Sequence, residues 1–412
     1  MLDKMEPENI FLDYASTTPI DAEVLSAMEP YFKEKFGNPN SLHLMGQEAR
    51  RAVDNAREQI KIFLNASSLR EIFFTGSATE ANNLAISGVV KAAKLRLAGL
   101  PHIITTVIEH KSALAPCQEL EKRGVAKITY LKVSKDGFID INDFKQALRP
   151  ETVLVSVMYA NNEIGAIQPI AEISEIIKEY RKNKTGIREK TPFFHSDACQ
   201  AAGYLEMDVE KLGVDLMTVN GSKIYGPKGI GFLYVRSGVK LKPIVYGGGQ
   251  EKGLRSGTEN LAAIAGLAEA FKISQKERKK ESARLIKLRD KLIKGILKTI
   301  PKTVLNGHPK KRLPNNVNVS ILDIEGESAV LYLDARGIAV STGSACTSRN
   351  LEPSHVISAL GRPFEYSHSS LRFTLGRKTN GKEIDYVLKI LSEVAGILRK
   401  VSSLPLAEKL KK

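Results

Sequence analysis

Seven short apolar or β-branched runs alternate with amphipathic helical patterns between residues 71 and 235. The runs are EIFFT, HIITTVI, AKITYL, TVLVSVMY, PFFHSD, VDLMTV and GIGFLYV. This alternation is typical of parallel βαβ architecture, and strands this apolar predict a sheet that helices cover on both faces. Ligands of such sheets bind at the carboxyl ends of the strands, so we expect a functional site in the loops that follow these runs.

The pattern changes after Thr258. A long helix is expected through about Ile300, and shorter strands and helices follow in NNVNVSIL, ESAVLYLDARG, SSLRFTLG and EIDYVLKILSEVAGILRK. We therefore predict an α/β protein in which residues 20–265 form a large domain with a mostly parallel sheet. Residues 1–19 and 266–412 are expected to form a smaller α+β domain.

Charge is unevenly spread along the 412 residues. Of the net charge of +15, the segment from Phe271 to Arg312 contributes 15 − 3 = +12. Leu285, Leu288 and Leu292 recur there at helical spacing, which favours an amphipathic helix with a solvated basic face. An acidic protein or RNA partner is an alternative, but no aromatic interleaving or nucleic-acid motif accompanies the charge, so direct nucleic-acid binding is not expected.

The hydrophobic runs and the cysteines limit the cellular compartment that the sequence indicates. No apolar run approaches the roughly 18 residues of a membrane span, and the first dozen residues lack the apolar core of a signal peptide. Cys117, Cys199 and Cys346 are too few and too scattered for a disulfide framework or a metal site. We expect a cytoplasmic protein with no metal.

The run Gly76–Glu80 follows the strand EIFFT and opens a helical stretch. Such a helix N-terminus binds phosphate, although Ser and Thr at helix starts often serve only as N-caps.

Two residues at later strand ends carry candidate chemistry. Asp197 ends PFFHSD, where a carboxylate can hold a pyridinium nitrogen protonated, and its alternative role is a helix N-cap. Lys223 lies between VDLMTV and a Gly-Pro turn. A Schiff base needs a neutral amine, which a partly buried site beside a cationic cofactor supplies, whereas the alternative is a surface loop lysine.

Cys346 and Arg372 lie in the predicted small domain. Cys346 has small polar neighbours in STGSACTS, which indicates an exposed thiol on a loop and makes it the nucleophile candidate among the three cysteines. Arg372 in HSSLRF is suited to bidentate binding of a substrate carboxylate, and a structural ion pair is its alternative role.

Taken together, these residues resemble cysteine desulfurases of the nitrogen-fixation and iron–sulfur-assembly type, within the class V aminotransferase superfamily. The resemblance runs nearly end to end. Its landmarks are LDYASTTP, FGNP, GSATEANNLAI, IEHK, NNEIG, SDACQ, SKIYGPKGIG, GGGQEKGLRSGT, STGSACTS, LEPS and SSLRFTLGR. It implies pyridoxal-phosphate fold type I with a seven-stranded sheet.

The resemblance also implies a role for each site residue. Lys223 would form the Schiff base with pyridoxal 5'-phosphate, Asp197 would pair with the ring nitrogen, and His110 would stack on the ring and move protons. Further cofactor contacts would come from Ala78, Thr79, Asn162, Gln200, Asn220 and Ser222, and from Thr258 of the neighbouring subunit of a homodimer. Asn38 and Arg372 would bind the substrate carboxylate. Relatives usually carry Ser-x-His before the lysine, whereas this chain has Asn220-Gly221-Ser222.

The implied reaction converts L-cysteine to L-alanine and leaves a persulfide on Cys346 for an iron–sulfur scaffold protein or another acceptor, with tRNA thiolation as a further use of the sulfur. The motif GSACTS with a longer linker to LEPS resembles the long-loop group and favours scaffold-directed delivery. Three alternatives remain open. An aminotransferase or selenocysteine lyase would keep Lys223 and Asp197 without requiring Cys346, a non-catalytic binding protein would keep only the fold, and an RNA-binding protein would use the basic segment.

Overall fold

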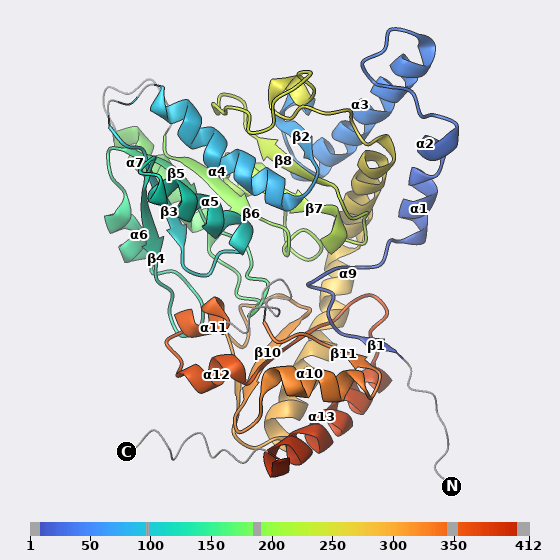
Figure 1. Cartoon of the computed structure of the whole chain (residues 1–412), viewed down its shortest axis with the longest axis vertical. Coiled ribbons are helices and arrows are strands. Elements are labelled where there is room, and N and C mark those ends of the chain that lie inside the picture. Colours follow the sequence, from blue (N-terminus) through green and yellow to red (C-terminus); the bar gives the residue numbers. More distant parts are fainter. Residues whose placement is uncertain (1–8, 96, 98, 184–190, 344–352, 402–412) are drawn as a thin grey trace.

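The computed structural model describes residues 9–95, 97, 99–183, 191–343 and 353–401. A larger body surrounds a seven-stranded sheet, a smaller body lies below it, and helix α9 (Leu261–Thr299) passes from one to the other (Figure 1). The predicted fold class is confirmed.

The seven apolar runs form the seven strands of the large sheet, in the order β2-β8-β7-β6-β5-β3-β4. Strand β8 is antiparallel to both neighbours, and the remaining pairs are parallel. The strands are β2 (Ile72–Thr75), β3 (His102–Thr106), β4 (Lys127–Leu131), β5 (Thr152–Ser156), β6 (Phe193–Asp197), β7 (Leu216–Asn220) and β8 (Gly231–Val235).

Helices bury both faces of this sheet. In β6, Phe193 packs on the face that α4 and α5 cover, and Phe194 packs on the face covered by α3, α7 and the start of α9. Strands with two buried faces favour apolar residues on both sides, which explains the absence of a regular polar alternation in their sequences. The large-body helices are α1 (Ala22–Met28), α2 (Pro30–Lys33), α3 (Leu44–Leu64), α4 (Ala78–Lys94), α5 (Lys111–Lys122), α6 (Ile141–Ala147), α7 (Ile170–Asn183) and α8 (Val209–Leu212), with short 3-10 turns η1 (Leu69–Glu71), η2 (Gly221–Lys223) and η3 (Glu251–Gly253).

The smaller body has a separate core between two small sheets and two long helices. Its antiparallel sheet has the order β12-β10-β9, and β1 pairs with β11 in parallel. The elements are β1 (Ile10–Phe11), β9 (Thr303–Leu305), β10 (Asn316–Ile321), α10 (Gly326–Asp334), β11 (Ile338–Ala339), α11 (His355–Ala359), α12 (Phe364–His368), β12 (Ser370–Thr374) and α13 (Gly381–Val401).

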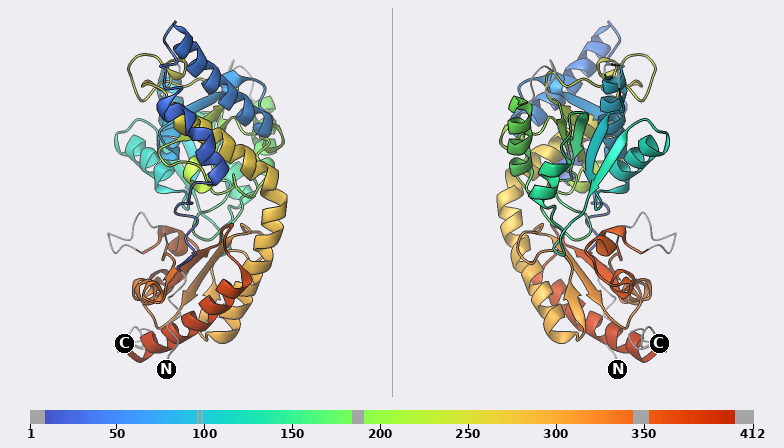
Figure 2. Two further views of the ribbon diagram at one scale, coloured as in Figure 1. Left: turned by 90° about the vertical axis from the view of Figure 1, so that its right-hand side faces the viewer. Right: turned by 90° about the vertical axis from the view of Figure 1, so that its left-hand side faces the viewer.

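Helix α9 contributes side chains to both cores. Its buried apolar residues from Leu261 to Phe271 belong to the large-body core, and those from Leu285 to Ile296 belong to the small-body core. The side views show it along one flank of the molecule (Figure 2). Exposed lysines on its second half, including Lys287 and Lys294, form the solvated basic face that the leucine spacing indicates. The domain boundary near residue 265 stays a prediction.

The N-terminal arm connects the two bodies near Lys223. The Ile10 amide donates to the Gly337 carbonyl in the small body, and the Thr18 amide donates to the Ser222 carbonyl in the large body, at 2.8 and 2.9 Å. Residues 12–18 therefore pass between the bodies. In the described part of the chain, no helix combines the length and the apolar character needed to cross a bilayer.

Candidate active site

A cavity of about 310 Å³ opens where β5, β6 and β7 end and the small body faces the sheet. Its lining comes from the N-terminal arm, five loops of the large body and one strand of the small body. The lining residues are Ala15, Ser16, Ala78, Thr79, His110, Ser112, Met158, Ala160, Asn162, Asp197, Cys199, Gln200, Asn220, Lys223 and Arg372. The carboxyl ends of the strands are thus the location of the site, as the strand pattern predicts.

The N-terminus of α4 forms one end of the cavity. The Ser77 hydroxyl accepts the Glu80 amide at 3.2 Å and caps the helix, and Ala78 and Thr79 line the cavity. The first amides of a helix have no acceptor within it and carry the positive end of its dipole. This end of the cavity therefore suits a phosphate group.

Asp197 is a nearly buried carboxylate, 6% exposed, at the end of β6. Its Oδ2 accepts from Asn82 Nδ2 at 2.7 Å and its Oδ1 accepts from the Cys199 amide at 3.0 Å. The second bond is the contact expected of a helix N-cap, which is the alternative role of Asp197. Asp197 also lines the cavity. A carboxylate oriented by two donors suits an N–H partner across the cavity.

Asn82 extends this arrangement to His110. It also donates to Ser112 Oγ at 2.8 Å, and Ser112 Oγ lies 2.7 Å from His110 Nδ1. The Ser112 amide donates to the same Nδ1 at 3.1 Å, and because an amide only donates, the neutral imidazole carries its proton on Nε2. Sequence reasoning missed Asn82, since nothing in its local pattern indicates a contact 115 residues away.

Lys223 ends the 3-10 turn η2 directly after β7, and its Nζ donates to the Ser16 carbonyl of the N-terminal arm. Asn220 Oδ1 accepts the Ser222 amide and the Ser222 hydroxyl, both at 3.2 Å, which fixes the start of this turn. Asn220 lines the cavity. Ser222 is absent from the cavity lining because its hydroxyl is directed to Asn220.

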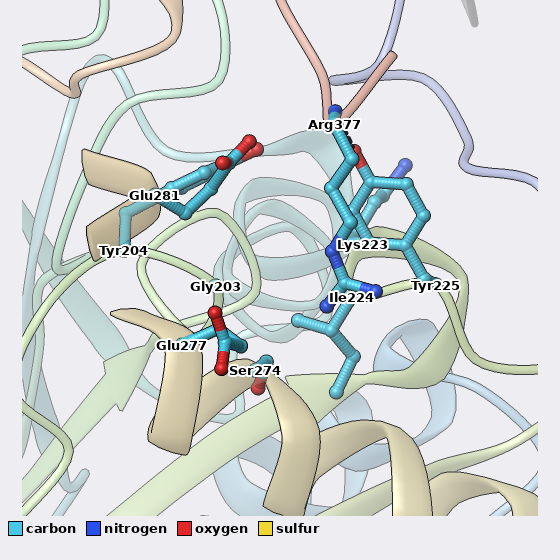
Figure 3. A pocket seen from close by; sticks show the side chains of 9 residues that line it. All are labelled: Gly203, Tyr204, Lys223, Ile224, Tyr225, Ser274, Glu277, Glu281 and Arg377. Atoms are coloured by element: carbon cyan, nitrogen blue, oxygen red, sulfur yellow. Dashed lines mark hydrogen bonds between the residues drawn. The ribbon is translucent and has the colours of Figure 1, made fainter. Parts of the chain in front are cut away.

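Lys223 also lines a second, much smaller cavity (Figure 3). Helix α9 supplies Glu277 and Glu281, and Arg377 of the small body faces them. The Arg377 guanidinium lies 4.2 Å from the centre of the Tyr225 ring and pairs with Asp21. A volume of about 10 Å³ accommodates at most one water molecule, so this space is a packing seam between the bodies.

Arg372 reaches the cavity from β12 and is 2% exposed. Its Nη2 pairs with Asp13 Oδ1 at 2.7 Å and its Nη1 donates to the Asn162 carbonyl at 3.3 Å. Its buried Nε has no partner among the described residues. Arg372 therefore forms the ion pair of the alternative interpretation and also lines the cavity.

The remaining predicted residues divide into three groups. Gln200 lines the cavity and donates to the Ala15 carbonyl at 2.9 Å. Asn38 and Thr258 are exposed and lie outside the cavity lining of their own chain. Cys346 lies outside the described residues.

The two described cysteines are buried and free of disulfides. Burial raises the pKa of the Cys117 thiol to about 12 and that of Cys199 well above its ordinary value. Both thiols are therefore protonated at neutral pH, whereas a cysteine nucleophile must be a thiolate.

A family model described as Aminotransferase class-V matches residues 10–387, and the chain belongs to this family. Within it, the chain is 48% identical to the cysteine desulfurase IscS of Dictyoglomus turgidum, over 95% of this chain and 96% of that protein. It is 46% identical to the cysteine desulfurase IscS of Methanosarcina thermophila, over 97% and 95%.

Solved structures show the same architecture. A NifS-like protein superposes with a TM-score of 0.86 at 35% identity, covering 95% of this chain and all of that one. SspA in complex with cysteine superposes with a TM-score of 0.75 at 33% identity, over 89% and 98%.

Pyridoxal phosphate is the cofactor of this family, and the cavity fits it chemically. A helix N-terminus suits its phosphate, Asp197 suits a protonated ring nitrogen, and Lys223 supplies an amine for its aldehyde.

Proposed function

We propose that this protein is a cysteine desulfurase that takes sulfur from L-cysteine with pyridoxal phosphate and carries it on Cys346. The observation that carries the proposal is the convergence of Asp197, Lys223, Arg372 and the α4 N-terminus on one cavity. Identity of 46–48% to curated cysteine desulfurases over nearly the whole chain supports it.

The cavity residues would hold the cofactor at three places. Ala78 and Thr79 bind the phosphate, with Asn220 beside it and Ser222 supporting Asn220. Asp197 would pair with the ring nitrogen, and His110 would lie against the ring. Asn162 and Gln200 complete the site on the side of the ring hydroxyl.

When bound, pyridoxal phosphate supplies an electron-withdrawing ring that accepts charge from the substrate Cα. Arg372 holds the substrate carboxylate, and Lys223 removes the Cα proton and later returns it. Asn38 is a second proposed carboxylate contact, although it lies outside the cavity lining of its own chain. His110 donates from Nε2–H, because its Nδ1 already accepts the Ser112 amide. The chain thus provides a base, a proton donor and a carboxylate anchor in separate positions.

Sulfur leaves the substrate by attack of the Cys346 thiolate on the substrate sulfur. The new S–S bond forms as the Cβ–S bond breaks, and the electron pair of the Cβ–S bond stays with carbon, which takes up a proton. The products are L-alanine and a Cys346 persulfide, so the sulfur count balances. Cys117 and Cys199 are poor alternatives because burial raises their thiol pKa values.

The proposed acting form is a homodimer that delivers sulfur in the cytoplasm to an iron–sulfur scaffold protein or another acceptor. Phe32, Phe36, Leu42 and Leu44 expose 61%, 62%, 91% and 79% of their surfaces, more than an isolated chain favours. Asn40 Nδ2 lies 3.4 Å from Glu259 Oε2, so this apolar segment adjoins Thr258. A second copy covering the segment would bring Thr258 toward the cofactor phosphate of its partner.

Product analysis of the purified holoenzyme tests the proposal. With L-cysteine and a thiol reductant, we expect sulfide and L-alanine in equal amounts. Turnover that requires a 2-oxo acid and releases no sulfide would instead identify an aminotransferase and refute the proposal.

A further inference from the structure

The turn formed by residues 161–165 lies between the two bodies. Asn161 Oδ1 accepts the amides of Glu163 and Ile164, both at 2.9 Å, and Gly165 has a φ of +74°. Asn162, at the tip of the turn, lines the active-site cavity. The turn is therefore rigid, and a displacement of Glu163 would displace a cavity residue.

The small body holds this turn through its backbone carbonyls. The Glu163 carbonyl accepts from Asn316 Nδ2 at 3.0 Å and from Asn318 Nδ2 at 3.1 Å. Buried Arg312 donates to the Ile164 carbonyl at 3.0 Å. These bonds leave the Glu163 side chain available for a different contact.

The Glu163 carboxylate lies where both flanks of residues 344–352 meet. The residue is 1% exposed, and its Oε2 accepts from the Ser354 hydroxyl. Gly343 is so close that an added Cβ would lie 3.0 Å from the same Oε2 and 3.2 Å from Ser354 Cβ. A single carboxylate thus binds Ser354 and lies beside Gly343, the two described flanks of the segment that contains Cys346.

Helix α11, which follows Ser354, is fixed to the large body by further contacts. The Ser354 hydroxyl also accepts the Ile357 amide at 3.2 Å as its N-cap. His355 Nε2 donates to the Glu109 carbonyl at 3.1 Å, directly before His110. Val356 and Ile357 pack with Ile108, Met158 and Ile164 in a small separate core.

We propose that Glu163 is a positioning residue for sulfur transfer, fixing the flanks of the Cys346 segment against the turn that carries Asn162. This inference rests on the proposed desulfurase function and assigns it a residue that the cofactor site does not use. A hydrogen bond from a hydroxyl to a carboxylate is about twice as strong as a hydrogen bond between neutral groups, and burial protects it from competing water. The Glu163–Ser354 contact would then fix where the chain resumes after residues 344–352.

Variants of Ser354 separate this contact from helix capping. Ser354→Thr keeps the hydroxyl, Ser354→Ala removes it, and Ser354→Asp caps α11 as well as serine does but places a like charge against Glu163. Glu163→Gln tests the other partner. Ser358→Ala is the matched control, because the Ser358 hydroxyl on the same helix contacts Ser367 and not Glu163.

Two readouts on holoenzyme distinguish carbon chemistry from sulfur transfer. Exchange of the alanine Cα hydrogen with deuterated water needs Lys223 and the cofactor but no cysteine, whereas single-turnover persulfide formation needs Cys346. We expect Ser354→Ala, Ser354→Asp and Glu163→Gln to slow persulfide formation at least tenfold while exchange and the cofactor absorbance stay within twofold of wild type. Ser354→Thr and Ser358→Ala should match wild type in both.

Two outcomes would overturn the inference. One is a Ser354→Asp variant that forms persulfide at the wild-type rate, and the other is an equal loss of exchange and persulfide formation. A wild-type protein that releases no sulfide from cysteine would refute the proposed function itself. The wild-type assay comes before the variants, so this outcome is distinguished from a failure of the inference about Glu163.

Discussion

At the scale of single residues, the cavity gives each side chain a partner that restricts what it can do. Asp197 is held by Asn82 and the Cys199 amide, and His110 has one nitrogen occupied by the Ser112 amide. Lys223 contacts the N-terminal arm at Ser16. Restricted side chains lose little entropy when a ligand binds, which favours a preorganised site.

Substitution of Lys223 and substitution of Cys346 should impair different steps of the reaction. Lys223→Ala removes the only proposed covalent attachment, so we expect loss of the yellow absorbance of the bound cofactor and of alanine Cα exchange. Cys346→Ser should keep both and reduce persulfide formation to background. Absorbance spectra and mass spectrometry of the trapped persulfide measure these effects. Cys117→Ala serves as the control for loss of a thiol, and a Cys346→Ser protein that transfers sulfur at the wild-type rate would exclude this cysteine as the carrier.

Local sequence predicted the residues that lie directly at strand and helix ends. Ala78, Asp197 and Lys223 meet at one cavity because the carboxyl ends of parallel strands share one edge of a sheet. Asn82 was not predictable, since its contact with Asp197 depends on how α4 packs on the sheet. The direction of the Ser222 hydroxyl, toward Asn220 rather than the cavity, depends equally on rotamers that a pattern does not encode.

At the scale of elements, the seven strands were predictable because burial on both faces leaves a continuous apolar run. The turn at residues 161–165 was not, because it is stabilised by Asn316, Asn318 and Arg312 from a distant part of the chain. The Arg312 guanidinium is fully buried, and burial lowers its pKa to about 9. It donates to Asn306 and Asn316 within the small body and to the Ile164 carbonyl of the turn, so it joins the turn to the small body.

Two glycines with the same φ test this junction. Gly165 and Gly229 both have a φ of +74°, but an added Cβ at Gly165 would lie 2.8 Å from Asn316 Oδ1, whereas at Gly229 it meets nothing within 4 Å. We expect Gly229→Ala to cost about 1 kcal/mol of unfolding free energy from backbone strain alone, and Gly165→Ala to cost roughly 2–4 kcal/mol. Urea unfolding measures both values. Equal losses would show that the contact with Asn316 relaxes freely.

At the scale of the whole molecule, buried histidines link stability to pH. His195 is fully buried between Ser156 and Thr218, and burial lowers its pKa to about 4. The unfolded chain binds a proton there below pH 6.5 while the native state does not, so stability falls as pH drops from 6.5 toward 4. The slope is at most about 1.4 kcal/mol per pH unit for this residue. His195→Gln should flatten the dependence of the urea midpoint on pH in this window, and an unchanged slope would contradict the assignment.

Association of two chains should depend on the exposed apolar segment. Leu42→Asp with Leu44→Asp places charges where a partner would bury apolar surface, so we expect a dimer-to-monomer shift and weaker cofactor retention, because Thr258 of the partner is then lost. Sedimentation velocity measures the first effect and dialysis of the holoenzyme measures the second. Leu331→Asp, which changes a leucine on α10 that is 70% exposed, provides the control. A wild-type monomer would refute the proposed dimer.

The length of helix α9 affects the geometry of the active-site cavity. Its 39 residues extend roughly 58 Å without a break. The cavity has Asp197 in one body and Arg372 in the other, and the cores of these bodies pack on opposite halves of the helix. One residue inserted near its middle would turn the small body by about 100° and move it by about 1.5 Å relative to the sheet. The spacing between Asp197 and Arg372 therefore depends on the number of residues in α9, and we expect insertions that surface loops tolerate to disrupt the cavity here.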